Sequence, residues 1–300
     1  WSLVEGQQFL ALEVDPTLED PTLTVRFRQP GGKVNKTVVI RHSELVPPAT
    51  PDLLRAYWPF DSDFANASPL GGRLDASAHN GAGIARDGGI RGGALQLNRE
   101  QQQFVNIPRS FLDDNSAGHS ISCWIKPGSL PAHGSKERHF ILESTAEGKP
   151  DAKAAYHLSL ELSQADDPQK VAIRLHSQTL KPASKPEAAP TPAVHGPFQT
   201  AHPRAQLENQ WSHLTVTFDS EQLQLFLNGK PAGSHKLNPP GPAAEFGGLI
   251  IGGHRAGTGR NFDGLIDEVA IWQTVLSAAD ALELYNGGKA HPPTRLRKNR

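Results

Sequence analysis

Residues 262–288, FDGLIDEVAIWQTVLSAADALELYNGG, decide the fold of this chain. Alternate side chains of an extended chain point to opposite faces, and residues 262–272 are apolar on both faces. One face carries Leu265, Val269 and Ile271, and the other carries Phe262, Ile266, Ala270 and Trp272. The pattern predicts a strand that is covered on both sides.

Asp267 and Glu268 interrupt these two apolar faces. A carboxylate buried without a partner is costly, so we expect Asp267 to be satisfied. Two partners are open: a cation shared with Asp61 or Asp75, or backbone N–H groups of a neighbouring turn.

The second half of the stretch predicts a short helix. Ser277 is a favourable N-cap, Asp280 occupies the reciprocal position of a capping box, and Gly287-Gly288 supplies the stop. The expected docking stripe is Ala278, Ala281, Leu282 and Tyr285.

Short strands with turn signals between them also recur upstream, with almost no helical periodicity. Asn228-Gly229 is a strong type I′ hairpin signal that closes the strand 222–227. The other expected strands are 119–126, 138–144, 155–162, 170–176, 212–219, 248–253 and 262–272. About a dozen strands with opposed faces predict two packed antiparallel sheets.

Several short motifs in order carry a family resemblance. GLIDEVAIW (264–272), LSAAD (276–280) and LYNGG (284–288) resemble the closing signature of laminin-G-like domains in bacterial multidomain proteins. Those domains form part of the pentraxin-related, concanavalin A-like lectin/glucanase group. Matching motifs upstream are LRAYWPFD (54–61), LDASAHNG (74–81), GALQL (93–97), VNIP (105–108), ISCWIKP (121–127), QWSHLTVT (210–217) and LFLNG (225–229). The resemblance implies an all-β, two-sheet antiparallel jelly-roll sandwich with a short C-terminal helix.

The expected domain organisation places this jelly roll at residues 54–288. Residues 1–46 predict a small β unit with strands at 9–14, 23–28 and 34–40, interpreted as the end of a preceding domain or a fragment packed on the sandwich. Residues 47–53 predict a stiff proline-rich linker and residues 289–300 a basic tail. The sequence starts at Trp1 and contains no methionine, which indicates a fragment or a processed product.

Composition excludes several function classes. The formal net charge is -1 and the pI is about 7.0, so nothing favours capture of nucleic acid or of an anionic membrane. No apolar run is long enough to cross a bilayer. The single cysteine, Cys123, excludes an internal disulfide and predicts a buried, inert thiol.

Two loops stand out in the sequence. Residues 178–207 are rich in proline and alanine and predict disorder, with a functional excursion as the alternative. Residues 71–93 are rich in Gly, Asp and Asn and predict a turn-dense surface segment that could hold an ion.

Catalysis is not expected. Sandwich glucanases of similar fold carry paired carboxylates on one strand, as E-x-D-x-x-E or E-x-D-x-E. Glu161 has no such neighbour in its strand, and Asp267 and Glu268 are adjacent, so they are expected on opposite faces. The histidines show no ligand or triad spacing. The chain is therefore predicted not to be an enzyme.

Four aspartates suggest a calcium site. Asp61, Asp63 and Asp75 follow the expected opening strand, and Asp267 lies in the closing strand that could pair beside it. The alternative is that Asp61 and Asp75 bond nearby backbone N–H groups in turns. A pentraxin-type calcium site is not expected, because the residues before the closing strand, 253–260, are not acidic.

Sugar binding is implied by the resemblance rather than by individual residues. Sugar platforms are usually exposed aromatic rings, but Trp58, Trp124, Trp211 and Trp272 are expected to be packed. The loop candidates are Phe64, Phe198 and Phe246.

The sequence thus favours a non-catalytic, monomeric module for recognising a glycan or protein, or a spacer, in a larger exported bacterial protein. An extracytoplasmic location is expected. The alternatives are a catalytic glycan-processing sandwich and a structural insert in an enzyme or signalling protein whose active domain lies elsewhere.

Overall fold

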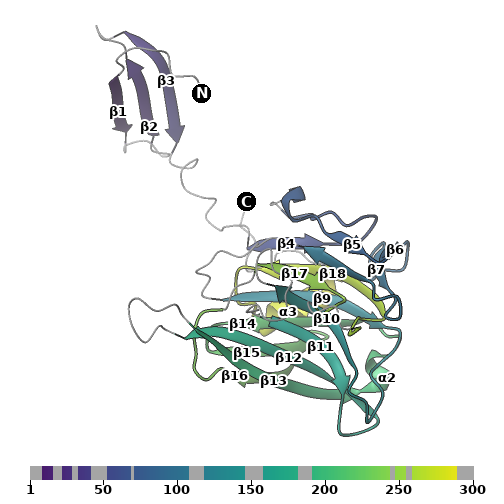
Figure 1. Ribbon diagram of the computed structural model, residues 1–300. Coiled ribbons are helices and arrows are strands. Elements are labelled where there is room, and N and C mark those ends of the chain that lie inside the picture. Colours follow the sequence, from purple (N-terminus) through teal and green to yellow (C-terminus); the bar gives the residue numbers. More distant parts are fainter. Residues whose placement is uncertain are drawn as a thin grey trace. The chain divides into compact units, whose positions relative to one another are not determined.

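The computed structural model describes residues 9–15, 22–28, 33–41, 53–68, 71–107, 118–145, 158–181, 191–243, 247–254 and 259–288. The chain divides into two compact units, a small one within Trp1–Asp52 and a large one within Leu53–Arg297 (Figure 1). The small unit is a three-stranded antiparallel sheet of β1 (Phe9–Asp15), β2 (Thr22–Arg28) and β3 (Val34–Arg41), paired in sequence order. These are the strands predicted for the start of the chain.

The described part of the large unit contains two antiparallel sheets that form a jelly-roll sandwich, as predicted. The first sheet, here the β18 sheet, has β18 (Gly264–Trp272) at its centre. Its order is β16 (Lys230–Lys236), β15 (Gln222–Leu227), β14 (Ser212–Phe218), β9 (His119–Pro127), β18, β7 (Ala94–Leu97) and β6 (Gly83–Ala85), with β4 (Leu54–Trp58) also paired to β18.

The second sheet, here the β11 sheet, packs its inner face on the first. Its order is β13 (Thr191–Pro203), β12 (Lys170–Lys181), β11 (Leu158–Gln164), β10 (Arg138–Thr145), β17 (Gly248–Ile251), β8 (Phe104–Ile107) and β5 (Ser77–His79). A 3-10 helix, η1 (Gly71–Leu74), precedes β5, and a single helical turn, α2 (Arg204–Leu207), follows β13. The inward-facing side chains of both sheets form one large buried cluster that includes Trp58, Phe218 and Ile271.

Strand β18 has three partners, which explains why both of its faces are apolar. It pairs with β9 on one side, and on the other side with β7 through Gly264–Ile266 and with β4 through Val269–Trp272. The predicted division of its side chains is wrong at one point, because the pairing with β9 shifts register between Asp267 and Ala270. Glu268 adopts a left-handed backbone conformation there, with φ of 53°. This β-bulge inserts one residue and reverses the alternation.

The bulge puts Ile266, Val269 and Ile271 together in the inner core. Ala270 and Trp272 face outward instead, where they form a second buried cluster with Leu54, Leu276 and Leu284. Asp267 and Glu268 are both buried. The expectation that they simply occupy opposite faces assumed an unbroken strand, and the bulge invalidates that reasoning.

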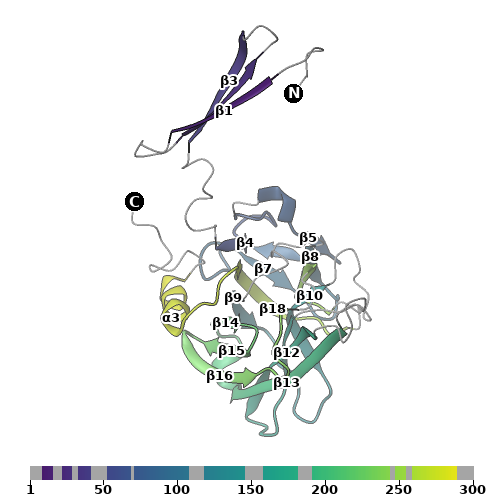
Figure 2. The same cartoon turned by 90° about the vertical axis from the view of Figure 1, so that its left-hand side faces the viewer.

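Helix α3 (Ala278–Gly287) covers this second cluster on the outer face of the β18 sheet (Figure 2). The predicted capping box is present: Ser277 Oγ accepts from the Asp280 backbone N–H at 3.2 Å, and Asp280 Oδ2 accepts from the Ser277 backbone N–H at 2.6 Å. The helix ends at Gly288 in a left-handed conformation, as expected from the double glycine. The predicted stripe is wrong in part, because Ala278 and Leu282 are exposed and Leu284 is buried instead.

The hairpin of β12 and β13 corrects another prediction. Residues 178–181 and 191–207 were expected to be disordered, yet the structure places them in β12, β13 and α2, while 182–190 lie outside the described residues. Two features explain this. β13 is an edge strand, where proline is tolerated because one side of the strand needs no N–H donor. Buried polar groups are also paired: Thr179 Oγ1 and His195 Nε2 lie 2.7 Å apart.

The turn between β15 and β16 is of the predicted type. Asn228 and Gly229 both have positive φ, 51° and 72°, as a type I′ turn requires. Gly229 also packs under α3, since a Cβ at this position would lie 2.8 Å from Leu282 Cα. Cys123 is buried as expected, and burial raises the pKa of its thiol to about 12.

Candidate functional site

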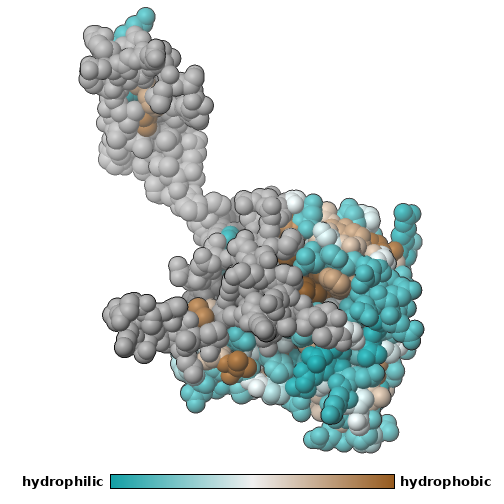
Figure 3. Space-filling view, viewed as in Figure 1, coloured by the Kyte–Doolittle hydropathy of each residue, from teal (hydrophilic) through white to brown (hydrophobic). Residues whose placement is uncertain are grey.

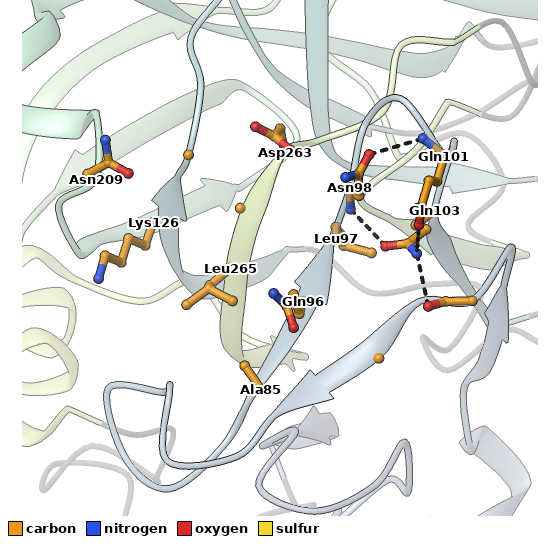
Figure 4. Close-up of a pocket in the computed structure, with 14 residues that line it drawn as sticks. Ala85, Gln96, Leu97, Asn98, Gln101, Gln103, Lys126, Asn209, Asp263 and Leu265 are labelled. Carbon is orange, nitrogen blue, oxygen red and sulfur yellow. Dashed lines mark hydrogen bonds between the residues drawn. The ribbon is translucent and has the colours of Figure 1, made fainter.

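A pocket of about 590 Å³ opens on the outer face of the β18 sheet, between β6, β7, β18 and β9 (Figure 4). Its volume lies within the range of about 300–1,000 Å³ that is usual for small-molecule sites. We call it the amide pocket, because five of its side chains are carboxamides: Gln96, Asn98, Gln101, Gln103 and Asn209.

The floor of the amide pocket is a row of side chains that the strand register puts side by side. Gly83 pairs with Gln96, Gln96 with Leu265, and Leu265 with Lys126. Paired residues of antiparallel strands point to the same face, so these positions lie across four neighbouring strands. Figure 4 shows Leu265 between Lys126 and Gln96, with Ala85 below them in this view.

One wall is a hydrogen-bonded group of amides in the turn after β7. Asn98 donates its backbone N–H to Gln103 Oε1 at 2.8 Å, and Gln103 Nε2 donates to Gly81 O at 2.9 Å and to Gln101 Oε1 at 2.7 Å (Figure 4). Asn98 Oδ1 in turn accepts from the Gln101 backbone N–H at 3.1 Å. These bonds fix the wall before any ligand arrives.

The opposite wall carries charge. Asp263 and Lys126 both line the pocket, and the Asn209 backbone N–H donates to Pro127 O at 2.7 Å, which anchors the loop that presents the Asn209 amide. Among the described residues, the side chains of Gln96, Lys126 and Asn209 make no hydrogen bond to other protein groups. Their donors and acceptors are therefore available to a ligand.

Glycines leave room in the pocket. A Cβ on Gly83 would meet nothing within 4 Å, so the space above this strand is open. At Gly264, with φ of 124°, a Cβ would lie 2.2 Å from Lys126 O, so glycine is required for β18 to approach β9. The result is a shallow, rigid surface of neutral donors and acceptors with one carboxylate and one ammonium group, suited to a polyhydroxylated ligand.

The residues predicted to hold calcium are placed as follows. Asp267 is fully buried, and its Oδ2 accepts from the Ile90 N–H and its Oδ1 from the Glu268 N–H, both at 2.8 Å. The Ile90 N–H is a backbone donor of a neighbouring turn, which the sequence left open as one alternative. Burial, and secondarily the charge of Glu268, raise the pKa of Asp267 to about 7 against the opposing effect of these hydrogen bonds.

The other three predicted ligands lie in the loop after β4 and in the turn before β5. Asp75 Oδ1 accepts from the Asn66 N–H at 2.9 Å, and Asp63 Oδ1 accepts from the Ala65 N–H at 2.9 Å. Asp61 is exposed and packs close to Gly92, where a Cβ would lie 2.1 Å from Asp61 Oδ1. Within the described residues, no group of three or more His, Cys, Asp or Glu side chains could hold a metal ion. This donor set does not fit a shared ion, and calcium stays a prediction.

Glu268 has a different role from Asp267. Its Oε2 accepts a 2.6 Å hydrogen bond from the hydroxyl of Tyr57 on β4. Burial, and then this hydrogen bond to the carboxylate, raise the pKa of Tyr57 well above its ordinary value. Glu268 thus joins β4 and β18, which are the first and the last strand of the β18 sheet in chain order.

Sequence reasoning missed a buried group of charges on the outer face of the β11 sheet. Glu161 is completely buried, and its Oε1 lies 3.3 Å from Arg174 Nε, 3.7 Å from Arg138 Nη1 and 3.6 Å from His176 Nε2. Burial lowers the pKa of Arg174, while the charge of Glu161 raises it. The group becomes visible from the strand register, because Glu161 pairs with Arg174 across β11 and β12.

Glu143 lies on the same face of the β11 sheet. It pairs with Ser159, two residues before Glu161, and its Oε1 is 3.9 Å from His254 Nε2. Glu161 therefore has a carboxylate neighbour on the adjacent strand, although none in its own. Both carboxylates are buried beside cationic or imidazole groups, an arrangement typical of a structural ion-pair network.

The predicted aromatic positions divide into two groups. Trp58, Trp124 and Trp272 are buried as expected. Trp211 is half-buried and lines a second pocket, so the expectation that it is packed is wrong, because it precedes β14 at the open end of the sheet. Phe64 and Phe198 pack partly buried against the core, which leaves them poor sugar platforms, and Phe246 lies outside the described residues.

The surface seen in Figure 3 is predominantly hydrophilic over the described part of the large unit. No helix among the described residues is long and apolar enough to span a membrane.

Similar solved structures share the fold. Domain 4 of AbnA, a GH43 extracellular arabinanase from Geobacillus stearothermophilus, in complex with arabinotriose, is 20% identical with a TM-score of 0.51, covering 77% of this chain and 98% of that domain. The binding domain of Paraclostridial Mosquitocidal Protein 1 is 15% identical with a TM-score of 0.55, covering 79% of this chain and 52% of that one.

The receptor binding domain of botulinum neurotoxin mosaic serotype C/D is 13% identical with a TM-score of 0.51, covering 79% of this chain and 51% of that one. The chain thus spans about half the length of these toxin domains. At such identities the likeness shows the fold alone. No curated protein matches the sequence.

The family model described as the concanavalin A-like lectin/glucanases superfamily matches residues 99–281. That segment runs from the wall of the amide pocket through β18 into α3, so it contains most of both sheets. It is more than half of the chain, and it includes the resemblance motifs from VNIP (105–108) to LSAAD (276–280). The motifs between residues 54 and 97 and the motif LYNGG (284–288) lie outside it. The chain belongs to the concanavalin A-like lectin/glucanases superfamily.

Proposed function

We propose that this chain is a non-catalytic saccharide-binding module, and that the amide pocket takes a neutral oligosaccharide. The observation that carries the proposal is the row of Gln96, Leu265 and Lys126 on the pocket floor, which places polar groups on either side of an apolar residue. A sugar ring has the matching surface, with hydroxyl groups around apolar C–H groups.

The pocket chemistry favours binding over turnover. Glycoside hydrolysis ordinarily needs two carboxyl groups on either side of the scissile bond. Among the described residues that line the amide pocket, Asp263 is the one carboxylate. Support also comes from the fold relatives, one of which is a domain in complex with arabinotriose and another a neurotoxin binding domain in complex with SialylT.

A protein ligand is the other form of recognition expected from the sequence. One fold relative, a neurotoxin binding domain, is in complex with synaptotagmin II. We favour a glycan because the available groups of the amide pocket are separate amides around a shallow floor, without a hydrophobic anchor pocket of the kind that protein interfaces use.

The test begins with an array of neutral oligosaccharides, including arabinans, β-glucans and galactosides, followed by calorimetry on any ligand found. Gly83→Leu adds bulk to the open space above the floor, where a Cβ would meet nothing within 4 Å. We expect this variant to lose at least about tenfold in affinity, which corresponds to the ~1.4 kcal/mol of one or two lost contacts.

Two matched variants serve as controls. Gly83→Ala adds only one methyl group and should bind nearly as well as the unchanged protein. Gln199→Ala removes an exposed glutamine of β13, on the other sheet, and should have no effect, whereas Gln96→Ala should weaken binding. Full affinity in Gly83→Leu would rule out the amide pocket as the site.

The wider setting is part of the same proposal. We place the module in a larger exported protein, where it would hold a partner domain near its glycan. This rests on the resemblance of the sequence motifs to those of bacterial multidomain proteins, and on a fold relative that is one domain of an extracellular arabinanase.

A further inference from the structure

A second pocket, of about 650 Å³, lies where α2 and the segment after it meet the β15–β16 turn and α3. Its lining includes Gln206 from α2, Gln210 and Trp211 from the segment after α2, Asn228 and Lys230 at the β15–β16 turn, and Tyr285 from α3. We call it the Tyr285 pocket. It shares no lining residue with the amide pocket.

The aromatic wall of the Tyr285 pocket is held rigidly. The ring of Tyr285 stacks on Trp124 at 5.5 Å between centroids and 26° between planes. Trp124 is buried and also contacts His213, at 5.0 Å between ring centroids. Tyr285 is half-buried, so one part of its ring faces the pocket beside Trp211. Such fixed rings are the platforms on which sugar rings stack.

The polar side of the pocket presents donors. The His213 backbone N–H donates to Asn228 Oδ1 at 2.8 Å, and the Asn228 backbone N–H donates to His213 O at 2.8 Å. Because the carboxamide oxygen is committed to the strand, the Asn228 amide group is oriented with its Nδ2 donor away from it. Lys230, two residues later, is exposed at the rim.

The charge of the two pockets differs. The amide pocket balances Lys126 with Asp263. The Tyr285 pocket has Lys230 and no Asp or Glu among its described lining residues, and His202 is engaged with Thr200 Oγ1 at 2.8 Å. An anionic group would thus meet an ammonium group and amide donors with no carboxylate to repel it.

We propose that the Tyr285 pocket is a second saccharide site, selective for a sugar that carries a negative charge. The sugar ring stacks on Tyr285 and Trp211, and its carboxylate or sulfate pairs with Lys230 and accepts from Asn228 Nδ2. The inference adds a separate acidic-sugar specificity to the proposed neutral-glycan site, and it stands if the amide pocket binds nothing.

The test uses three probes with one common core: lactose, 3′-sialyllactose and 3′-sulfolactose. Binding is followed by calorimetry and by the fluorescence of Trp211 against a Trp211→Phe reference. We expect the two charged probes to bind at least about tenfold tighter than lactose, as one charge-assisted contact would give. Raising the salt concentration should reduce this preference, because Lys230 is exposed to solvent. The ratio between the two charged probes tells whether carboxylate or sulfate is preferred.

Lys230→Gln should bring both charged probes down to the affinity of lactose, and Tyr285→Leu should weaken all three. Lys236→Gln, at the far exposed end of the same strand, is the matched control and should change nothing. Lys230 is exposed, so its substitution leaves the fold intact and the result interpretable.

The inference fails if neither charged probe binds, or if Lys230→Gln and Tyr285→Leu both leave binding unchanged. Loss of the charged probes in Gly83→Leu but not in Lys230→Gln would assign them to the amide pocket and overturn the second site alone. Loss of neutral-glycan binding in Gly83→Leu with retained charged-probe binding supports both sites.

Discussion

The Ile90 backbone N–H donates a 2.8 Å hydrogen bond to Oδ2 of Asp267, a residue 177 positions later. The contact lies where β18 changes partner from β7 to β4, so the β-ladder of β18 is interrupted on that side. The carboxylate receives backbone donors at that gap, and a Cβ on Gly89 would lie 2.7 Å from it. Asp267 thus fastens the loop before β7 to the central strand.

The first prediction concerns this bond. In Asp267→Asn, one carboxamide end presents N–H groups to a backbone N–H, so one hydrogen bond is lost and a buried donor is left unpaired. We expect the free energy of unfolding to fall by about 1–3 kcal/mol in urea denaturation at a pH near 4, where the side chains of Asp267 and of its Asn replacement are both neutral in the folded protein. Asp87→Asn, an exposed carboxylate in the same loop, is the control and should have little effect.

The pH dependence of the same variant is a second readout. The pKa of Asp267 is raised from 3.8 to about 7 in the folded state, so the folded protein keeps a proton that the unfolded chain releases. The protonated Asp267 side chain therefore stabilises the fold at low pH, and this stabilisation is lost as the pH rises from about 4 to 7. Asp267→Asn should flatten that part of the pH profile. An unchanged profile would contradict the raised pKa.

Calcium binding remains a separate prediction, made from Asp61, Asp63, Asp75 and Asp267. If these residues bind the ion in solution, calcium should raise the melting temperature by mass action, a chelator should reverse it, and Asp61→Asn should abolish the response. If the backbone hydrogen bonds seen here are their sole role, the melting temperature should not respond to calcium or chelator. Thermal melts in calcium and in chelator, with magnesium as the control, distinguish the two.

Removing Glu161 should be far more damaging than removing a surface carboxylate. Glu161→Ala leaves Arg138 and Arg174 without their buried counter-ion, so we expect a loss of about 3–5 kcal/mol in the free energy of unfolding. Glu137→Ala breaks the partly exposed pair with Arg99 and should cost about 0–1 kcal/mol. Equal effects in chemical denaturation would mean that the Glu161 charge is not balanced as the geometry indicates.

The chain should show no hydrolase or lyase activity on β-glucans, uronans or sialosides. The alternative rests on Glu143 and Glu161, which share one face of the β11 sheet. Reducing-sugar and unsaturated-product assays check this on the unchanged protein. Turnover that disappears in Glu143→Gln or Glu161→Gln would make the β11 sheet an active site.

The capping box of α3 gives a prediction of local stability. Ser277→Ala removes the side chain that bonds the Asp280 N–H and Oδ2, so the free energy of unfolding should fall by about 1 kcal/mol. Ser62→Ala, an exposed serine in a loop, is the control. Hydrogen exchange of α3 should rise in Ser277→Ala. Unchanged stability would mean that α3 is held by packing alone.

Much of the fold followed from sequence because it depends on local signals. The apolar run of β18, the Asn228-Gly229 turn and the Ser277 cap each involve residues a few positions apart, and the structure contains all three. The bulge at Glu268 could not be read in this way, since it arises where two strands far apart in sequence meet β18. Composition misled at 191–203, because it cannot distinguish a proline-rich loop from a proline-tolerant edge strand.

The amide pocket and the charged group around Glu161 were harder to foresee, because strand register brings together residues that are far apart in the sequence. Gln96, Leu265 and Lys126 are unremarkable in sequence, and only the pairing of β7, β18 and β9 aligns them. Glu161 likewise gains Arg174 from β12 and Arg138 from β10. Trp211 was assigned to the packed tryptophans by motif, although its position just before β14 leaves it at the sheet end.

The pairing of β4 with β18 has a mechanical consequence. Leu54, where β4 begins, pairs with Trp272, where β18 ends, and the Gln273 N–H donates to Leu53 O at 2.7 Å. Tension applied at Leu53 and Gln273 would therefore pull at the same end of this ladder and load its hydrogen bonds one after another rather than together. Strand β4 would detach from β18 pair by pair at low force while the remaining strands keep their pairing. Under such a load the sandwich would separate first between β4 and β18, which would let a tethered module lengthen before the rest of it unfolds.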